Sequence, residues 1–277
     1  MIFLKSLVSK VKAFNLRRIE RYRLRKKPIK TPEGFLYKGP GTQKSENWER
    51  FEREFLKKIF ANYELFLNVG AHYGYYCCMA RQAGLKLIAF EPLVVNFKML
   101  LDNLKVNNFE ENCILINAAA GKKPTISQIS GVFSTATMLE NSGNDESLSQ
   151  TIPIVPIDAV TQGINKKTLV LMDVEGFEHE ALLGAQSLLS QSEATDWIIE
   201  IFSFWTPKNG SPLENKDYFK TFEIMFANGY QVWLIGEVFR KIEVDELLLL
   251  KGEHYSKRFA GNFYFSRSNL VIPNLSD

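Results

Sequence analysis

From Phe66 to Tyr76 the chain reads Phe-Leu-Asn-Val-Gly-Ala-His-Tyr-Gly-Tyr-Tyr. An apolar run leads into Gly70 and Gly74 and then opens a helix. Glycines at this place let the backbone turn tightly and approach a ligand closely. The spacing is Gly-x-x-x-Gly, whereas a pyrophosphate-binding turn reads Gly-x-Gly-x-x-Gly. The stretch therefore predicts a strand, a ligand-facing turn and a helix, without the phosphate-binding turn of a nicotinamide dehydrogenase.

Outward from this turn, strand-like and helix-like segments alternate along the chain. Such alternation implies crossover connections and a parallel α/β sheet. The expected strands are 65–69, 85–90, 113–118, 168–172 and 197–201, with a closing pair at 230–235 and 262–265. The expected helices are 75–83, 93–106, 177–190 and 218–227. Thr151–Ile157 is expected as an edge strand, because Pro153 and Pro156 cannot donate to a ladder.

Two groups of acids follow predicted strands. Glu91 ends the second strand, twenty-one residues after Gly70, close to the offset of about 20 residues at which an acid meets ribose hydroxyls. Asp173 and Glu175 follow the strand 168–172, at the edge where open α/β sheets bind ligands. Two acids in one turn repel each other, so one of them can keep a raised pKa and serve as a base.

Three stretches carry a resemblance to a known family. They are Asn68-Val-Gly-Ala-His-Tyr-Gly-Tyr75, Phe90-Glu-Pro-Leu-Val-Val-Asn-Phe97 and Asp173-Val-Glu-Gly-Phe-Glu178. Together they resemble FkbM-type methyltransferases of the class I superfamily, over about residues 65–266. The resemblance implies a Rossmann-like fold with a seven-stranded, mostly parallel sheet, one antiparallel strand and helices on both faces. It also implies methyl transfer from S-adenosylmethionine to an oxygen atom, commonly a hydroxyl of a sugar, a glycan or a natural product.

The resemblance assigns roles to individual residues. Gly70, Ala71, His72 and Gly74 would line the methionine end of the cofactor, and Asn68 would hydrogen-bond its ammonium group. Glu91 would bind the ribose, beside Pro92 and Asn96 of the same stretch, and Asn117 with Ala118 would contact the adenine. Asp173 would lie beside the transferred methyl group.

A hydroxyl is a poor nucleophile, so a general base is expected at the acceptor. We predict Asp173 or Glu175 for this role, with Glu200 on the strand 197–201 as a second acid. His179 is an alternative base. Most of the catalysis can come from holding the acceptor oxygen behind the methyl group in a dry site.

The expected organisation is an N-terminal region, 1–60, before a methyltransferase domain, 61–277, with insertions at 121–150 and 237–260. The net charge of +3 is uneven, because residues 1–30 hold eleven Lys and Arg and the single acid Glu20. Residues 1–27 place apolar residues at helical spacing, which is typical of a helix at an anionic membrane surface or glycolipid, or of a helix packed on the body. A lead-in helix is expected at 46–60.

The composition limits the remaining classes. Three cysteines, two of them adjacent, make no disulfide framework, and no run of about 20 apolar residues occurs, so we expect a cytoplasmic protein, with membrane-surface association through residues 1–27 as a further prediction. The sequence contains no cluster of Cys and His ligands, so we predict no structural metal. Nucleic acid is not an expected partner, because Asp173 is followed by no Asn-Pro-Pro-Tyr segment and there is no Pro-Cys nucleophile. A non-catalytic binding module at a membrane-associated assembly remains an alternative.

Overall fold

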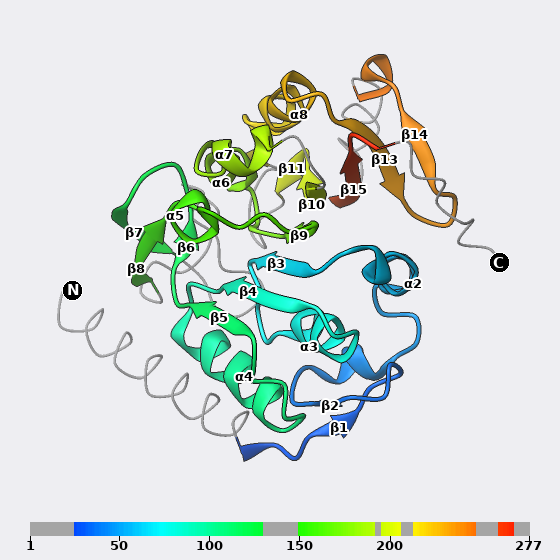
Figure 1. The fold of residues 1–277 in the computed structure, drawn as a ribbon, viewed down its shortest axis with the longest axis vertical. Helices are drawn as coiled ribbons and strands as arrows, with labels where there is room; N and C mark the ends of the chain where they lie inside the picture. The colour runs from blue at the N-terminus through cyan, green and yellow to red at the C-terminus, as the bar shows by residue number, and fades with distance from the viewer. Residues whose placement is uncertain (1–24, 130–148, 192–194, 206–212, 248–259, 269–277) are drawn as a thin grey trace, which may run out of the picture.

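The computed structural model describes residues 25–129, 149–191, 195–205, 213–247 and 260–268 (Figure 1). Its centre is an eight-stranded sheet with the strand order β14-β13-β15-β10-β9-β3-β4-β5. The strands are β3 (Leu65–Val69), β4 (Lys86–Phe90), β5 (Cys113–Ile116), β9 (Thr168–Met172), β10 (Thr195–Phe202), β13 (Gln231–Ile235), β14 (Arg240–Ile242) and β15 (Ala260–Ser266).

Strand directions within this sheet agree with the predicted class. The five strands from β10 to β5 are parallel to one another. β15 runs antiparallel to both β10 and β13, so β13 has the direction of the parallel set. The predicted seven strands with one antiparallel member are thus confirmed, and β14, antiparallel to β13, adds an eighth strand from the predicted insertion 237–260.

Helices cover both faces of the sheet (Figure 1). On one face lie α2 (Arg50–Ile59), α3 (Tyr75–Gln82) and α4 (Val94–Lys105), and on the other lie α6 (Glu178–Leu183), α7 (Gln186–Ser190) and α8 (Tyr218–Ala227). Successive residues of a strand point to opposite faces. In β3, Leu65 and Leu67 accordingly belong to the core under α6 to α8, whereas Phe66 belongs to the core under α2 to α4.

The single helix predicted over 177–190 is wrong, because the segment forms α6 and α7. The carboxylate of Asp158, in the short helix α5 (Asp158–Thr161), accepts hydrogen bonds from the backbone N–H groups of Ser187 (2.9 Å) and Leu188 (3.2 Å). These contacts cap a new helix start and separate α7 from α6.

A second, three-stranded sheet corrects another prediction. It has the order β6-β8-β7 and consists of β6 (Ala119–Ala120), β7 (Thr125–Ile129) and β8 (Gln150–Val155). The segment predicted as an edge strand is therefore the central strand. β6 pairs only with Ile154 and Val155, which lie between the two prolines, so the missing N–H groups do not prevent pairing on that side. Part of the predicted insertion 121–150 is regular strand, and residues 130–148 lie outside the described residues.

Residues 31–62, named the cap segment from here on, pack on the face covered by α3 and α4. They follow β1 (Ile29–Lys30) and contain β2 (Leu36–Tyr37), the 3-10 helices η1 (Gly41–Lys44) and η2 (Phe60–Asn62), and α2. Phe55, Leu56 and Ile59 of α2 are buried in the same core as α3. The described part of the predicted N-terminal region is therefore continuous with the core of the main fold.

The predicted amphipathic helix falls mostly on residues 1–24, outside the described residues. A further short pair is β11 (Phe204–Trp205) with β12 (Leu213–Glu214).

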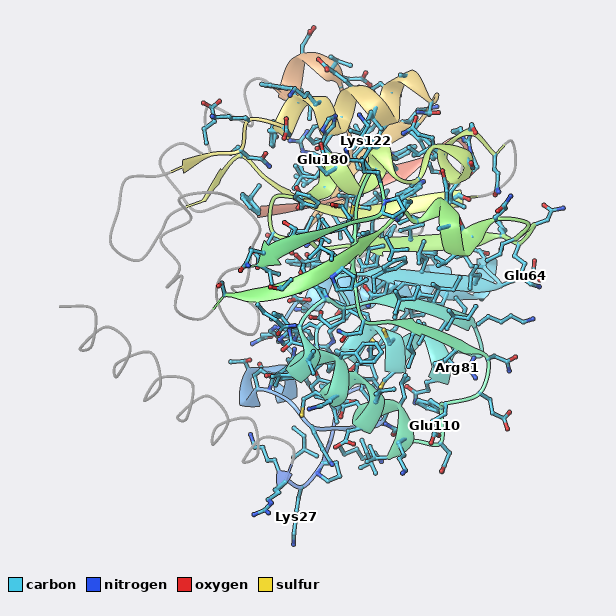
Figure 2. All side chains as sticks on the ribbon, turned by 90° about the vertical axis from the view of Figure 1, so that its left-hand side faces the viewer. Lys27, Glu64, Arg81, Glu110, Lys122 and Glu180 are labelled. Carbon is cyan, nitrogen blue, oxygen red and sulfur yellow. The ribbon has the colours of Figure 1, made fainter. Side chains whose placement is uncertain are left out.

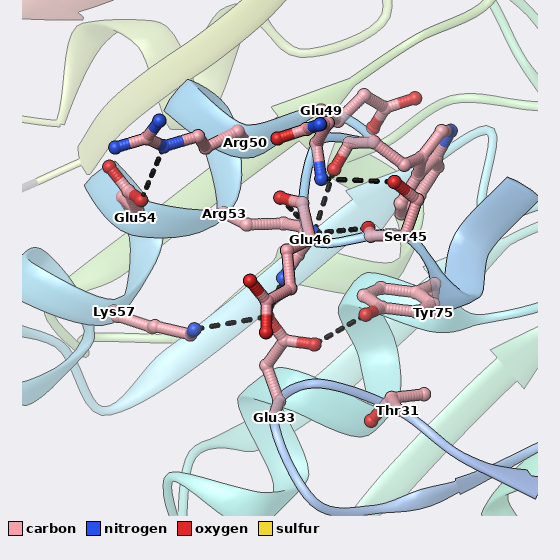
Figure 3. Close-up of polar contacts among 12 residues, drawn as sticks. Thr31, Glu33, Ser45, Glu46, Glu49, Arg50, Arg53, Glu54, Lys57 and Tyr75 are labelled. Carbon is pink, nitrogen blue, oxygen red and sulfur yellow. Dashed lines mark hydrogen bonds and ion pairs between the residues drawn. The ribbon is translucent and has the colours of Figure 1, made fainter.

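A buried ion cluster holds the cap segment in place (Figure 3). Glu33, whose side chain is 3% exposed, contacts the Arg53 guanidinium at 2.6 Å and the Lys57 ammonium at 3.0 Å. The Tyr75 hydroxyl of α3 donates to the other oxygen of the same carboxylate. Burial opposes ionisation of Glu33, but the hydrogen bonds from Tyr75, Lys57 and Arg53 outweigh it and lower its pKa. The cluster joins the start of the cap segment to α2 and to α3.

We expect Glu33→Gln to reduce the free energy of unfolding by about 3 kcal/mol or more, because the buried Arg53 charge would lose its carboxylate. Urea denaturation measures this loss. The matched control is Glu54→Gln, which breaks the solvent-exposed pair of Arg50 and Glu54 in the same helix and should cost about 0.5 kcal/mol or less. Equal losses in the two variants would show that the cluster does not hold the cap segment.

The same cluster has a predicted pH dependence. Because the folded-state pKa of Glu33 is lowered, its stabilisation is complete above the unfolded-state pKa of about 4.3 and is lost as pH falls through the folded-state pKa. The difference in stability between the wild type and Glu33→Gln should therefore be constant from pH 6 upward and shrink below about pH 4.

The outer surface is polar and the interior is filled. Charged side chains such as those of Lys27, Glu64 and Glu110 project from the outside of the body, whereas side chains fill the space between the sheet and its helices (Figure 2). In the described parts of the chain, none of the helices combines the length and the apolar composition needed to cross a bilayer.

Candidate active site

A cavity of about 400 Å³ lies at the carboxyl-terminal edge of the central parallel strands. Its floor comes from the ends of β3, β4, β9 and β10, where open α/β sheets bind ligands, and the cap segment and the start of α3 form its wall. The volume falls within the range of about 300–1,000 Å³ typical of small-molecule sites. The lining residues are Tyr37, Pro40, Thr42, Gln43, Trp48, Glu49, Glu52, Asn68, Gly70, Ala71, His72, Tyr75, Tyr76, Phe90, Glu91, Pro92, Leu93, Asn96, Ala118, Ala119, Ala120, Ile129, Leu171, Asp173, Val174, Glu175, Glu200 and Asn262.

The glycine turn after β3 joins three strands at this edge. Gly70 has a φ of +88°, and a Cβ placed on it would lie 1.8 Å from the carbonyl oxygen of Asp173. The backbone N–H groups of Gly70 and Ala71 both donate to the carbonyl of Phe90, at 3.0 Å and 2.8 Å. The turn therefore needs a residue without a side chain, since β3 and β9 approach too closely for any other.

Glu91 organises the next part of the cavity. Its carboxylate accepts hydrogen bonds from the backbone N–H of His72 (2.7 Å), the backbone N–H of Leu93 (2.9 Å) and the side-chain amide of Asn96 (3.2 Å). Burial raises its pKa to about 8, although these bonds favour the ionised form. Glu91 thus fixes the glycine turn against the start of α4 while it lines the cavity.

We expect Glu91→Gln to weaken S-adenosylmethionine binding by about tenfold or more, because an amide presents only one acceptor oxygen to these donors. Calorimetric titration measures the change. The control is Glu110→Gln, an exposed acid before β5 (Figure 2). Unchanged affinity in Glu91→Gln would remove Glu91 from cofactor binding.

Asp173 and Glu200 form a carboxyl pair at the ends of β9 and β10. Both side chains line the cavity, and each affects the pKa of the other. Burial raises the pKa of Asp173, and the Asp173 charge, burial and the nearby Glu175 and Glu49 raise the pKa of Glu200 well above its ordinary value. Burial and the surrounding negative charges therefore favour the protonated form of Glu200.

The turn after Asp173 is shaped by its own backbone. Glu175 has a φ of +52°, which a non-glycine residue rarely adopts. The N–H of Gly176 donates to the buried carboxylate of Glu178 at 2.8 Å, and burial raises the pKa of Glu178 to about 8. Glu178 is thus a fixed part of the turn that holds Asp173 and Glu175 in the cavity wall.

The cap segment adds side chains that the sequence did not identify as functional. Glu49, just before α2, keeps solvent exposure at the cavity and accepts a hydrogen bond from the Tyr76 hydroxyl. The residue as a whole is exposed, but protein atoms surround its carboxyl end, and this burial, opposed by the Tyr76 bond and the Arg53 charge, raises its pKa to about 8. The Trp48 ring stacks on Tyr76, with centroids 6.1 Å apart. Glu52 accepts a hydrogen bond from Asn262 of β15 at 2.9 Å. For Glu49 and Glu52, the only signal in the sequence was the charge of the predicted lead-in helix, 46–60.

Most of the predicted site residues line this one cavity, but three do not. The residues that line it are Asn68, Gly70, Ala71, His72, Glu91, Pro92, Asn96, Ala118, Asp173, Glu175 and Glu200. Gly74, Asn117 and His179 are not part of the lining among the described residues. Gly74 packs against Leu100, and the Asn117 amide donates to the carbonyls of Glu91 (2.8 Å) and Pro92 (3.1 Å). Asn117 thus supports the strand end that carries Glu91.

Within the cavity the described lining residues include six carboxylates and neither Lys nor Arg. These acids do not form a metal site, since the described residues contain no group of three or more His, Cys, Asp or Glu arranged to hold an ion. A lining with carboxyl groups and no described Lys or Arg disfavours a phosphate group.

Comparisons with known proteins identify relatives of this fold. The family model described as the methyltransferase FkbM domain matches residues 68–232, more than half of the chain. The search of curated proteins found no match to the chain.

Three solved structures are similar to the chain. Methyltransferase FkbM from Methylobacillus flagellatus KT has 18% sequence identity and a TM-score of 0.46, covering 73% of this chain and 43% of its own. An O-methyltransferase from Bacillus cereus in complex with SAH has 12% identity and a TM-score of 0.44, with 82% of each chain covered. Precorrin-6y C5,15-methyltransferase from Geobacter metallireducens GS-15 has 11% identity and a TM-score of 0.43, covering 78% of this chain and 88% of its own. The chain thus spans less than half the length of the Methylobacillus protein, and these similarities are too low to transfer a substrate or a residue role.

Proposed function

The chain belongs to the FkbM methyltransferase domain family, and from this we propose that it methylates a hydroxyl group of a sugar, a glycan or a natural product. S-adenosylmethionine is the cofactor, and it supplies a methyl group carried on a positively charged sulfur. The observation that supports the oxygen acceptor is that Asp173 and Glu200 both line the floor of the cavity, where a carboxylate can take up the proton of a hydroxyl.

The residues present fit this cofactor. The cavity has the size of a small-molecule site, the backbone at Gly70 leaves room for close approach, and Glu91 offers a carboxylate to hydroxyl groups. The absence of Lys and Arg from the described lining suits a cofactor that has no phosphate. Asn68, at the end of β3, is buried with its amide directed to the Cys77 sulfur at 3.3 Å, so its oxygen is the part that can accept from an ammonium group.

On the acceptor side, we assign three tasks to the chain. Asp173 accepts the proton of the acceptor hydroxyl, which makes the oxygen a better nucleophile. The stacked rings of Trp48 and Tyr76 offer an apolar face to a sugar ring, and Glu49 accepts hydrogen bonds from its other hydroxyl groups. The cap segment limits access of water from the side of α2, which favours a fixed and dry arrangement of the reacting groups.

Transfer of a labelled methyl group tests the proposal. The purified protein is incubated with methyl-labelled S-adenosylmethionine and a panel of neutral oligosaccharides and polyketide-type alcohols, with DNA and RNA as parallel acceptors. We expect label in an alkali-stable ether on a hydroxyl acceptor. Label in nucleic acid would support a nucleic-acid methyltransferase instead, and cofactor binding without transfer to any acceptor would support a non-catalytic module.

A further inference from the structure

Two polar side chains of the cap segment are buried with hydrogen-bonding capacity to spare. Tyr37, at the end of β2, has no exposed surface, and Gln43 of η1 is 6% exposed. Within the described parts of the chain, the Tyr37 hydroxyl and the Gln43 side-chain oxygen have no hydrogen-bond partner. Burying a polar group without a partner costs free energy, so such groups are rare in folded proteins. Both residues line the cavity, where a bound ligand can supply the missing partner.

The two side chains meet against Gly39. A Cβ placed on Gly39 would lie 2.1 Å from Cε1 of Tyr37 and 2.7 Å from the side-chain oxygen of Gln43. Burial raises the pKa of Tyr37 well above its ordinary value, and the nearby Gln43 side chain partly offsets this rise. No hydrogen bond of normal geometry joins the Tyr37 hydroxyl to the Gln43 oxygen. The two residues, named the cap polar pair from here on, are therefore neighbours that do not satisfy each other.

The cap polar pair lies beside the start of α3. The ring of Tyr37 contacts the ring of Tyr75 edge to face, with centroids 5.1 Å apart. The next residue, Lys38, donates its backbone N–H to the Asn103 side chain at 2.7 Å. The Asn103 amide in turn donates to the carbonyl of Tyr73 at 2.8 Å. Asn103 thus ties β2 to the glycine turn after β3, and this fixes the position of Tyr37 next to that turn.

The start of α3 is suited to a negatively charged group. Its N-cap residue, Gly74, makes no side-chain capping hydrogen bond, and its first two residues, Tyr75 and Tyr76, line the cavity. The first N–H groups of a helix have no partner within the helix, and the helix dipole favours an anion there. Because no described Lys or Arg lines the cavity, a carboxylate bound here would depend on neutral donors such as the cap polar pair.

The amino-acid end of S-adenosylmethionine carries such a carboxylate. The ammonium group of that end was matched above to the oxygen of Asn68, at the end of β3. The amide nitrogen of Asn68 contacts the Cys77 sulfur in the first turn of α3 at 3.3 Å. The carboxylate is attached to the same carbon atom as the ammonium group, so its donors must lie close to Asn68 as well. The start of α3 and the cap polar pair lie at this place.

We propose that Tyr37 and Gln43, together with the start of α3, bind the carboxylate at the amino-acid end of the cofactor. This proposal rests on the cofactor assignment above. The Tyr37 hydroxyl donates one hydrogen bond, and the Gln43 side chain donates a second through its NH2 group after a half-turn of the amide. The cap segment then forms part of the cofactor site in addition to the wall on the acceptor side.

Calorimetric titration with two ligands tests the proposal. Decarboxylated S-adenosylmethionine differs from S-adenosylmethionine only in the loss of the carboxylate. Tyr37→Phe removes the hydroxyl and keeps the ring in its packing. We expect this variant to bind S-adenosylmethionine about tenfold more weakly or worse, with decarboxylated S-adenosylmethionine within about threefold of wild type, because only the carboxylate loses a charge-assisted hydrogen bond. Gln43→Leu should change the two affinities in the same direction.

Tyr218→Phe is the matched control. Tyr218 of α8 also has no exposed surface, and its hydroxyl also has no partner within the described chain. It is not among the described residues that line the cavity, so its substitution should leave both affinities unchanged. Urea denaturation should show no loss of stability in Tyr37→Phe, because the hydroxyl that it removes has no described partner in the free protein.

The outcomes separate this proposal from the cofactor assignment. Failure of the folded wild type to bind S-adenosylmethionine would overturn the assignment itself. Unchanged S-adenosylmethionine affinity in Tyr37→Phe and in Gln43→Leu would overturn the carboxylate site and leave the assignment intact. An equal loss of affinity for the two ligands would also overturn it, since the two residues would then support the shape of the cavity and not the carboxylate.

Discussion

We expect Asp173→Asn to lower the rate of methyl transfer by about 100-fold or more, since an amide cannot accept the proton of the acceptor hydroxyl. Asp173 is the stronger candidate of the two acids in its turn, because it follows β9 directly at the floor of the cavity and burial raises its pKa. The measurement is the rate with saturating cofactor on an acceptor found in the labelling experiment. Affinity for S-adenosylhomocysteine, which lacks the sulfonium charge, should stay within about threefold and shows that the site is intact.

The pH profile of the same reaction provides a second readout. The pKa values of Asp173 and Glu200 are raised, so the base is ionised at high pH and the rate should fall as pH falls through the pKa of the pair. The control is Asp245→Asn, an exposed acid outside the cavity, with an unchanged rate and profile. Full turnover in Asp173→Asn, with the large loss appearing in Glu175→Gln, would transfer the role to Glu175.

The second large effect is expected for Gly70→Ala. A Cβ at this position would lie 1.8 Å from the Asp173 carbonyl oxygen, so β3 and β9 would have to separate where they form the cavity floor. We expect a loss in the free energy of unfolding of at least about 3 kcal/mol, from backbone strain and overpacking together. S-adenosylmethionine binding should be lost as well, because the same turn holds the backbone N–H groups against Glu91.

Gly84→Ala is the matched control for this variant. Gly84 also has a φ of +88°, but nothing lies within 4 Å of a Cβ placed there. Gly84→Ala therefore shares with Gly70→Ala a conformational strain of about 1 kcal/mol but lacks the steric conflict. Urea denaturation of the two variants thus isolates the contact with Asp173. Equal losses would mean that the approach of β3 and β9 is not what makes Gly70 necessary.

The parts of the site that lie on regular strand ends could be predicted from sequence. Gly70, Glu91 and Asp173 each follow an apolar run that can only be a buried strand, and parallel strands bring their carboxyl ends to one edge. The same reasoning placed Glu200 there, since its strand pairs with β9 in parallel register. Position along a strand was sufficient in these cases because the sheet fixes the geometry.

The contribution of the cap segment could not be predicted in this way. Glu49 and Glu52 reach the cavity because α2 packs on the face beside α3, and this placement depends on Glu33, Arg53 and Tyr75 meeting from separate parts of the sequence. A charged helix in an unplaced N-terminal region is normally exposed to solvent, and its pattern contains no sign of a cavity. Only the packing shows that two of its acids face a ligand.

The failed expectations have a similar physical origin. Gly74 has the left-handed φ that the turn requires, +79°, but its close neighbour is Leu100 of α4. Asn117 was expected within the strand 113–118 but lies just after β5, and its amide donates to two backbone carbonyls. In both cases the residue type was compatible with a ligand contact, but the residue makes its contacts within the protein instead.

Calorimetric titration of the purified chain with S-adenosylmethionine, S-adenosylhomocysteine and NAD tests whether this cavity binds the methyl donor. We predict micromolar binding of the first two, weakened by Glu91→Gln, and no binding of NAD, because the described cavity lining has carboxylates and no Lys or Arg to receive a pyrophosphate. A folded protein that binds neither S-adenosylmethionine nor S-adenosylhomocysteine would contradict the assignment of this cavity as a methyltransferase active site.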